Sequence, residues 1–257
     1  MLTFLRRLRQ SIAGPGSTKR YLLYAIGEIA LVMIGILLAL QVSNWNNEIA
    51  DVRTEKDYLQ RLVTELNENI VYYKEVRRRF LVEEERLNRI LSLWQGNEAI
   101  VPDSTQYMED FLAPSNIHLW YNEPVTWTQL IQTGDLKVLK NREIVIEIFQ
   151  YYSQLKKSAD NFMLYPFQQV AKARTLWTDA FVDQEPGSYR WALLSNSEVP
   201  IQVPSSEVYD FIWENRKVYQ KLYTNLSAIY RANYLSMGKI IDNGEELLTK
   251  IEGYLEE

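Results

Sequence analysis

Residues 21 to 47, YLLYAIGEIALVMIGILLALQVSNWNN, decide the architecture of this chain. From Tyr21 to Val42 the run carries a single charged side chain, Glu28. A helix of about 20 apolar residues, each rising ~1.5 Å, crosses a hydrocarbon core of ~30 Å. Trp45 follows, where an amphipathic ring suits the interface between lipid and water. The stretch therefore predicts one transmembrane helix over 21–47, and no later stretch of similar length is free of charges.

Two other interpretations of this stretch fit less well. A cleavable signal peptide has an apolar core of about 7 to 15 residues and a small-x-small cleavage site. This run is longer, and its end offers Ala39 and Ser43 but no convincing pair of small residues. A core helix of a soluble domain would carry a polar face, which the run lacks. Membrane anchoring is therefore favoured.

The charges on the two sides of the run differ in sign. Residues 1–20 carry formally +5, whereas the 210 residues after Asn47 carry −9. Because basic flanks remain in the cytoplasm, we expect residues 1–20 to be a cytoplasmic basic amphipathic segment and residues 48–257 to form an extracytoplasmic domain. The acidic domain is unsuited to nucleic acid, whose phosphates bind basic surfaces.

The basic segment itself has two interpretations, and the sequence does not separate them. MLTFLRRLRQSI (1–12) places leucines and an isoleucine at helical spacing, which is typical of a short helix in the inner-leaflet interface. Its arginines could equally serve only to fix the topology. Residues 13–18, AGPGST, then predict a hinge, with Ser17 or Thr18 capping the transmembrane helix.

The domain after the membrane is predicted to be all-α. No glycine or proline lies between Gly35 and Gly96, so a single helix is expected from Thr18 to Gln95. Its outer part has eleven positions at helical spacing, of which nine are apolar or aromatic, and such a stripe forms either a coiled-coil seam or the core face of a bundle. Further apolar residues widen the stripe, which favours the bundle. The eleven positions are Leu59, Leu62, Leu66, Asn69, Tyr73, Val76, Phe80, Glu83, Leu87, Ile90 and Trp94.

Shorter signals divide the rest of the chain. Helices are expected over 104–112 and, after Pro124, up to Gly134, which occupies the position that ends a helix. A long helix over 141–182 should kink near Leu164, because Pro166 removes a backbone hydrogen bond. Residues 183–204 predict a connection without regular structure.

The last helix is expected to begin at Ser205–Glu207 and to fray at its far end, where glycines recur. Its predicted core face includes Phe211, Val218, Leu222, Ile229, Met237, Ile240, Leu247, Ile251 and Tyr254. The expected fold is one transmembrane helix that continues into an extracytoplasmic bundle of three long helices plus short helices. The long helices would run out, back and out again, with the short ones at the distal turn.

No pattern in the sequence points to an enzyme or to a cofactor. His118 is the only histidine and cysteine is absent, which excludes zinc and di-iron motifs that need two histidines and any cysteine-ligated metal. We expect His118 to be an ordinary polar group in a loop. Without a glycine-rich phosphate loop or a nucleophile motif, catalytic, cofactor and metal sites are all expected to be absent.

Two functional hypotheses remain. The first is a structural or interaction protein that self-associates and presents residues 97–141 to a membrane or periplasmic partner. The second is a ligand-binding accessory or sensor subunit that acts with a separate membrane partner, with a site near the kinked helix. The candidate partner or ligand surface comprises His118, Trp120, Tyr121 and Trp127.

The transmembrane helix has one face suited to self-association. Seven residues lie within about 40° of one line along it: Tyr24, Glu28, Val32, Gly35, Ala39, Val42 and Asn46. Gly35 and Ala39 have the small-xxx-small spacing that lets helices approach closely, and a neighbouring helix would shelter Glu28 from lipid. The alternative is that Glu28 reaches the inner interface by itself.

YAIGEIALVMIGILLALQVSNWNN, preceded by FLRRLRQ, resembles the N-terminal signature of a bacterial family of single-pass membrane proteins of unknown function. TWTQLIQTGDLKVLKN (126–141) resembles a second element of the same family. The resemblance implies residence in the bacterial inner membrane and a helical periplasmic domain. It implies no catalytic residues.

Overall fold

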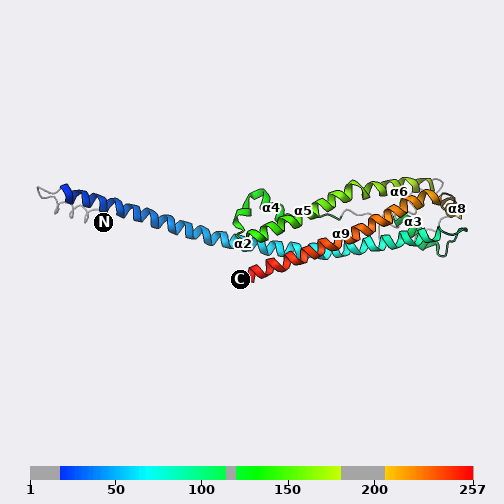
Figure 1. Ribbon diagram of the computed structural model, residues 1–257, viewed down its shortest axis with the longest axis horizontal. Helices are drawn as coiled ribbons and strands as arrows, with labels where there is room; N and C mark the ends of the chain where they lie inside the picture. The colour runs from blue at the N-terminus through cyan, green and yellow to red at the C-terminus, as the bar shows by residue number, and fades with distance from the viewer. Residues whose placement is uncertain (1–17, 114–119, 181–205, 257) are drawn as a thin grey trace. The chain divides into compact units, whose positions relative to one another are not determined.

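The computed structural model describes residues 18–113, 120–180 and 206–256, and all regular elements in these ranges are helical (Figure 1). The expected all-α fold is confirmed. The elements are α2 (Thr18–Leu93), α3 (Ser104–Leu112), α4 (Val125–Thr133), the short 3-10 helix η2 (Asp135–Val138), α5 (Arg142–Leu164), α6 (Pro166–Ala180), α8 (Ser206–Glu214) and α9 (Arg216–Glu256).

The chain divides into two compact units between Asp57 and Tyr58, and α2 contributes to both. The first large apolar side chain buried in the second unit is that of Tyr58. The membrane boundary after Asn47 stays a prediction. In the first unit, the large apolar side chains of the described helix are exposed from Leu22 to Val52, with only Tyr24 half-buried. Among the described helices, α2 alone is long and apolar enough to cross a membrane, which is consistent with membrane anchoring.

The second unit is a bundle of α2, α5–α6 and α9 around an apolar core. All eleven stripe positions predicted on α2 are buried, including the two polar ones. Glu83 accepts a hydrogen bond from Arg86 at 3.2 Å, which balances its charge inside the bundle. The bundle interpretation of the stripe is therefore confirmed.

The order of helix directions differs from the prediction. Glu65 contacts Tyr152, and Phe80 further along α2 contacts Phe162, so α5 runs parallel to α2. Asn88 contacts Ser227 and the earlier Lys74 contacts Glu245, so α9 runs antiparallel to both. Within the second unit, α2 and α5 therefore run in one direction and α9 in the other, whereas the prediction had consecutive long helices alternate (Figure 1).

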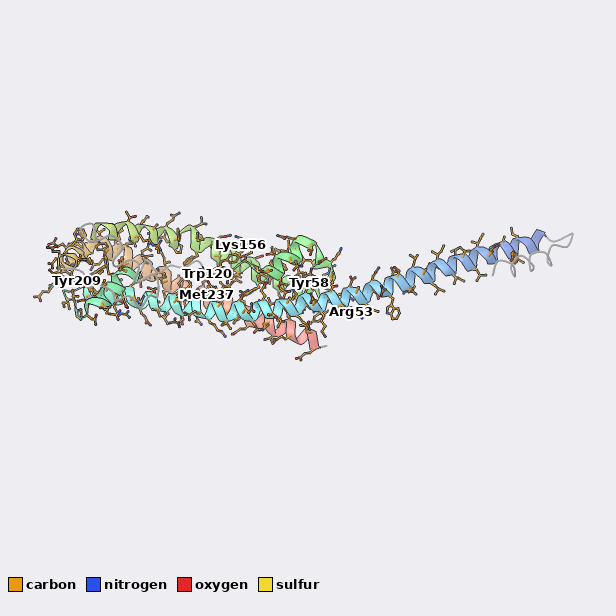
Figure 2. The ribbon with its side chains drawn as sticks, turned by 180° about the vertical axis from the view of Figure 1, so that it is seen from behind. Arg53, Tyr58, Trp120, Lys156, Tyr209 and Met237 are labelled. Atoms are coloured by element: carbon orange, nitrogen blue, oxygen red, sulfur yellow. The ribbon has the colours of Figure 1, made fainter. Side chains whose placement is uncertain are left out.

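The short helices lie at both ends of the second unit rather than at one. At the Trp94 end, α3 is fixed to α2 by Arg89, whose guanidinium donates to Asp110 at 2.8 and 3.0 Å, and Tyr107 packs against Tyr209 of α8. At the Tyr58 end lie α4 and η2 (Figure 2). These ends are 36 residues apart on α2, or ~54 Å. Residues 97–141 are therefore not presented together at one distal turn.

The break at Pro166 is confirmed, and a second break was not predicted. α5 ends at Leu164, Tyr165 leaves helical geometry (φ −121°, ψ −57°), and α6 begins at Pro166. A second interruption at Asn215, whose side-chain amide donates to the Phe211 carbonyl, separates α8 from α9. Val218 of α9 is 53% exposed, so its assignment to the core was wrong. The buried face of α9 passes through the neighbouring Tyr219 instead.

The expected fraying of the last helix is also wrong. α9 continues to Glu256, and Gly238 and Gly244 are buried within it. A Cβ on Gly244 would lie 3.1 Å from the Tyr151 hydroxyl, so this glycine lets α5 and α9 approach closely. Absence of a side chain here serves packing rather than flexibility.

Several predictions lie outside the described residues. They concern the basic segment 1–12, the hinge after it, the connection 183–204 and His118.

Candidate functional site

The second unit carries an open groove of about 770 Å³ between α4 and α5. Tyr121 and the residues just before α4 border one end of it. The groove is lined by Tyr121, Glu123, Pro124, Trp127, Thr128, Ile131, Gln132, Phe149, Tyr152, Ser153, Lys156, Lys157, Asp160 and Asn161. Its volume lies within the ~300–1,000 Å³ typical of ligand sites.

Glu65 of α2 fixes the start of α4 against α5. One carboxylate oxygen accepts from the Thr126 backbone N–H at 2.7 Å, and the other accepts from the Tyr152 hydroxyl at 2.8 Å. The first turn of a helix presents unpaired N–H groups and a positive dipole end, which a carboxylate satisfies. Glu65 thus joins α2, α4 and α5.

Two further polar residues of α2 hold the rest of the α4–η2 segment. The Tyr58 hydroxyl donates to Asp135 at 2.7 Å, and the Arg61 guanidinium donates to the side chain of Gln129. Between them, Gly134 ends α4 in the left-handed region (φ 73°), as predicted. Tyr58, Arg61 and Glu65 lie on one face of α2 at helical spacing, so one face of α2 positions the wall of the groove.

The floor of the groove is aromatic. Trp127 stacks on Tyr152, with ring centroids 5.5 Å apart and planes 16° apart, and meets Phe149 edge-on at 6.1 Å. Trp127 and Tyr152 are buried, whereas Phe149 is 56% exposed and Ile131 of α4 is 48% exposed. Phe149 and Ile131 therefore remain exposed to solvent beside the buried, stacked rings of Trp127 and Tyr152.

The opposite end of the groove is charged. Lys156 donates to Asp160 at 2.8 Å and lies 5.8 Å from the centroid of the Tyr121 ring. Lys157 and Glu123 add one charge of each sign. The groove thus grades from an apolar end at Ile131 and Phe149 to a balanced charged end, an arrangement that suits an amphipathic ligand or peptide.

Two phenols of this site, those of Tyr121 and Tyr152, are held in the neutral form. Burial raises the pKa of Tyr152, and the neighbouring Glu65 carboxylate raises it further. Burial likewise raises the pKa of Tyr121, so both phenols stay neutral near pH 7. Within the described residues, no group of three or more histidine, aspartate or glutamate side chains could hold a metal ion.

Comparison with protein-family models gives no match. Searches of the curated proteins and of the solved structures find no match either. The resemblance of residues 24–47 and 126–141 to a bacterial membrane-protein family therefore stays a prediction.

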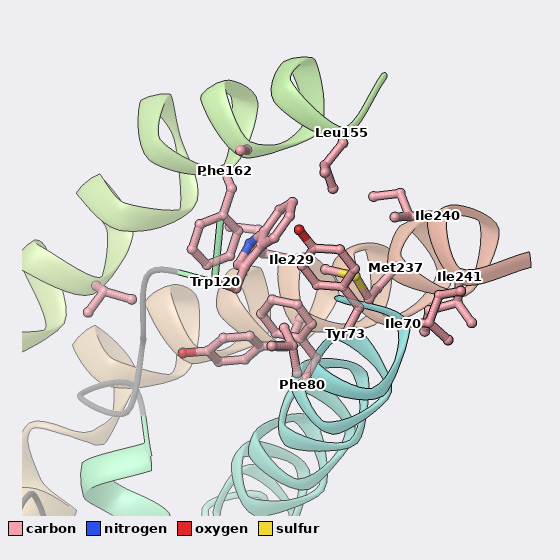
Figure 3. Packing of buried hydrophobic residues seen from close by; sticks show 14 of the residues in the cluster. Ile70, Tyr73, Phe80, Trp120, Leu155, Phe162, Ile229, Met237, Ile240 and Ile241 are labelled. Atoms are coloured by element: carbon pink, nitrogen blue, oxygen red, sulfur yellow. The ribbon is translucent and has the colours of Figure 1, made fainter. Parts of the chain in front are cut away.

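The candidate surface predicted from sequence is only partly brought together. Tyr121 and Trp127 line the groove, as the ligand hypothesis expected. Trp120 is 3% exposed and belongs to the core, where it packs edge-on against Tyr73 at 6.0 Å and Phe162 at 6.1 Å (Figure 3). His118 lies outside the described residues.

The predicted transmembrane face is open along α2 in the single chain. Glu28, Val32, Gly35, Ala39, Val42 and Asn46 are exposed, and Tyr24 is half-buried. A Cβ added to Gly35 would meet no atom within 4 Å. The described residues therefore leave room for a second helix against this face.

Sequence reasoning missed most of the groove. Glu65, Ile131, Phe149 and Lys156 were not singled out, because each resembles an ordinary position of an amphipathic helix. The spacing of Tyr58, Arg61 and Glu65 was visible, but their contacts lie 61 to 87 residues further along the chain. The one available signal was Phe149, which falls off the apolar face of its own helix.

Proposed function

We propose that this chain is a membrane-anchored interaction protein rather than an enzyme. It self-associates through its transmembrane helix and presents the helical bundle outside the cytoplasm. The basic segment 1–20, the apolar run and the acidic domain support a cytoplasmic N-terminus, and the family resemblance supports a bacterial inner membrane with a periplasmic domain. A reporter fused after Glu257 that works only outside the cytoplasm tests this topology, and cytoplasmic activity would refute it.

The observation that carries the proposal is the position of Glu28. It is the single charge of the apolar run, and it shares one exposed face with Gly35 and Ala39. An ionised side chain in lipid costs several kcal/mol at the bilayer centre, whereas a helix packed on this face would shelter the carboxyl group. Small residues allow the close backbone approach that such a contact needs.

Single cysteines test this face directly, because the chain has no native cysteine. Disulfide crosslinking in native membranes should occur at Val32→Cys and Ala39→Cys, and should be weak at Ile34→Cys and Leu37→Cys on other faces. Glu28→Leu should weaken crosslinking, since interhelical polar contacts contribute ~0.6–2 kcal/mol. Gly35→Leu should act more strongly through steric exclusion. Equal crosslinking at all four positions, or at none, refutes the proposed face.

A second candidate function, that of a ligand-binding accessory to another membrane protein, is favoured by the α4–α5 groove. The groove combines a stacked aromatic floor with a few charged groups. Native mass spectrometry of the detergent-solubilised chain should then show a bound small molecule. Ile131→Trp, which fills the apolar end, should remove it, and a wild-type chain without any such adduct would count against this role.

A further inference from the structure

The outward face of α5 carries large apolar residues that stay exposed in the single chain. The buried residues of α5, from Ile144 to Phe162, form one face. On the opposite face, within about 80° of one another, lie Ile146, Phe149, Ser153, Lys157, Asp160 and Leu164, and all six are exposed. We call these six residues the α5 outer face.

The apolar members of this face are large and open to solvent. Ile146 is 55%, Phe149 56% and Leu164 67% exposed. Ile146 and Phe149 lie near one end of the face, and Leu164 lies at the other. Ile146 and Leu164 are 18 residues, or ~27 Å, apart along the helix. Exposed apolar residues arranged at helical spacing on one surface mark an interaction site more often than scattered ones do.

The charges between these ends favour a second copy of the chain as the occupant. A two-fold interface brings the same patch of both copies together, so the patch must complement itself. Lys157 and Asp160 place one charge of each sign near the middle of the face, less than one turn apart. Lys157 has no partner among the described residues, and Asp160 pairs only with Lys156 in the same exposed helix. In a dimer, Lys157 of each copy can therefore pair with Asp160 of the other copy.

The size of the face explains why membrane anchoring matters. A strip ~27 Å long and one helix wide, ~10 Å, covers about 300 Å², well below the ~800 Å² per partner of a stable free-standing interface. Joining two copies through their membrane helices raises the effective concentration of the second contact, which lets a weak interface form. The face is thus suited to chains that are already held together.

We propose that the α5 outer face packs against the α5 outer face of a second copy, with the two helices parallel and a two-fold axis that runs along them past Ser153. Lys157 and Asp160 then lie on either side of this axis. This inference rests on the proposed self-association and adds a second contact, outside the membrane helix. Apolar contacts at Ile146, Phe149 and Leu164 would flank reciprocal Lys157–Asp160 pairs.

The test uses the full chain in native membranes, with Ser153→Cys as the reporter and Ser236→Cys, exposed on α9, as the matched control. Residues near a two-fold axis meet their own copies, so Ser153→Cys should form a disulfide dimer at least five-fold faster than the control. Phe149→Ser should reduce this rate several-fold. Equal rates at the two positions, or no crosslinking at Ser153→Cys, overturn the inference.

Charge reversal identifies the occupant. In the Ser153→Cys background, Lys157→Asp or Asp160→Lys alone should slow crosslinking several-fold, because each leaves two like charges facing each other. The double reversal should restore the rate, since a self-complementary patch again carries both signs. Failure of the double variant to recover would show that Lys157 and Asp160 of the two copies do not face each other, and would overturn the proposal.

The two contacts fail separately. Crosslinking at Val32→Cys and Ala39→Cys without crosslinking at Ser153→Cys retains the transmembrane interface and overturns the α5 contact. Crosslinking at Ser153→Cys with none in the membrane helix retains the α5 contact and refutes the transmembrane interface.

Discussion

Replacing Glu65 by alanine should detach the start of α4 from the bundle. The carboxylate is the shared acceptor of the Thr126 N–H and the Tyr152 hydroxyl, at 2.7 and 2.8 Å. Without it, α4 loses the group that satisfies its first turn, and Tyr152, which is 3% exposed, retains a hydroxyl with no acceptor. The aromatic floor of the groove, which depends on Trp127 stacking on Tyr152, should loosen as a result.

The size of this effect follows from the two hydrogen bonds. Hydrogen bonds to a charged group contribute ~1.5–3 kcal/mol each, and an unsatisfied buried hydroxyl costs ~1–3 kcal/mol. These contributions overlap, and Glu65 is only half-buried, so water can replace part of the loss. We therefore expect Glu65→Ala to lower the free energy that holds α4 in place by ~2–4 kcal/mol. Glu65→Gln, which keeps one acceptor oxygen, should have an intermediate effect.

Hydrogen exchange of the α4 amides measures this directly. At ~1.4 kcal/mol per factor of ten, exchange over residues 125–133 should accelerate roughly 30- to 700-fold in Glu65→Ala. Glu68→Ala, an exposed position less than one turn away on α2, is the matched control and should change exchange little. Exchange in Glu65→Ala that matches this control would refute the role assigned to the carboxylate.

Two further predictions concern η2 and the close packing of α9. The Tyr58 hydroxyl lowers the pKa of Asp135, so their contact contributes stability above about pH 4 that is lost as the pH falls through the lowered value. Acidification should therefore accelerate amide exchange in η2, after correction for intrinsic rates. Tyr58→Phe should reduce this dependence, because Thr133 also lowers the pKa of Asp135 and remains. An acid response in Tyr58→Phe equal to that of the wild type would contradict the role of the Tyr58 hydroxyl. Gly244→Ala should destabilise the bundle, because a Cβ 3.1 Å from the Tyr151 hydroxyl overpacks the core by ~1–3 kcal/mol, more than the ~1 kcal/mol gained in helix propensity. Gly253→Ala meets no atom within 4 Å and should stabilise slightly, so urea midpoints that shift equally in the same direction would refute the packing argument.

Local signals in the sequence predicted the elements well. Gly134 adopts the left-handed conformation that ends α4, and Pro166 separates α5 from α6 where expected. The stripe on α2 predicted its buried face, because a helix longer than ten turns repeats the same periodic pattern many times. Such features depend on residues close together in the chain.

The direction of α5 could not be predicted in the same way. An amphipathic helix packs equally well parallel or antiparallel to α2 as far as its own periodicity is concerned, and the assumption that consecutive long helices reverse direction was wrong. Contacts such as Phe80 with Phe162 decide the direction, and they join residues 82 positions apart. The position of α4 at the Tyr58 end, and with it the groove, depends on this parallel arrangement of α2 and α5. Neither could therefore be predicted from the sequence.

The core of the bundle is covered within one chain, so the exposed apolar residues of α5 need a different explanation. Every stripe position on α2 is buried within one chain, so folding of the bundle does not require a second copy to cover it. Ile146 and Leu164 lie opposite the buried face of α5, where a polar residue would serve the single chain at least as well. An apolar side chain in that position gains nothing from the hydrophobic effect until another surface covers it. Substitutions on the α5 outer face should therefore change association while leaving unfolding almost unaffected, which separates an interaction surface from a structural one.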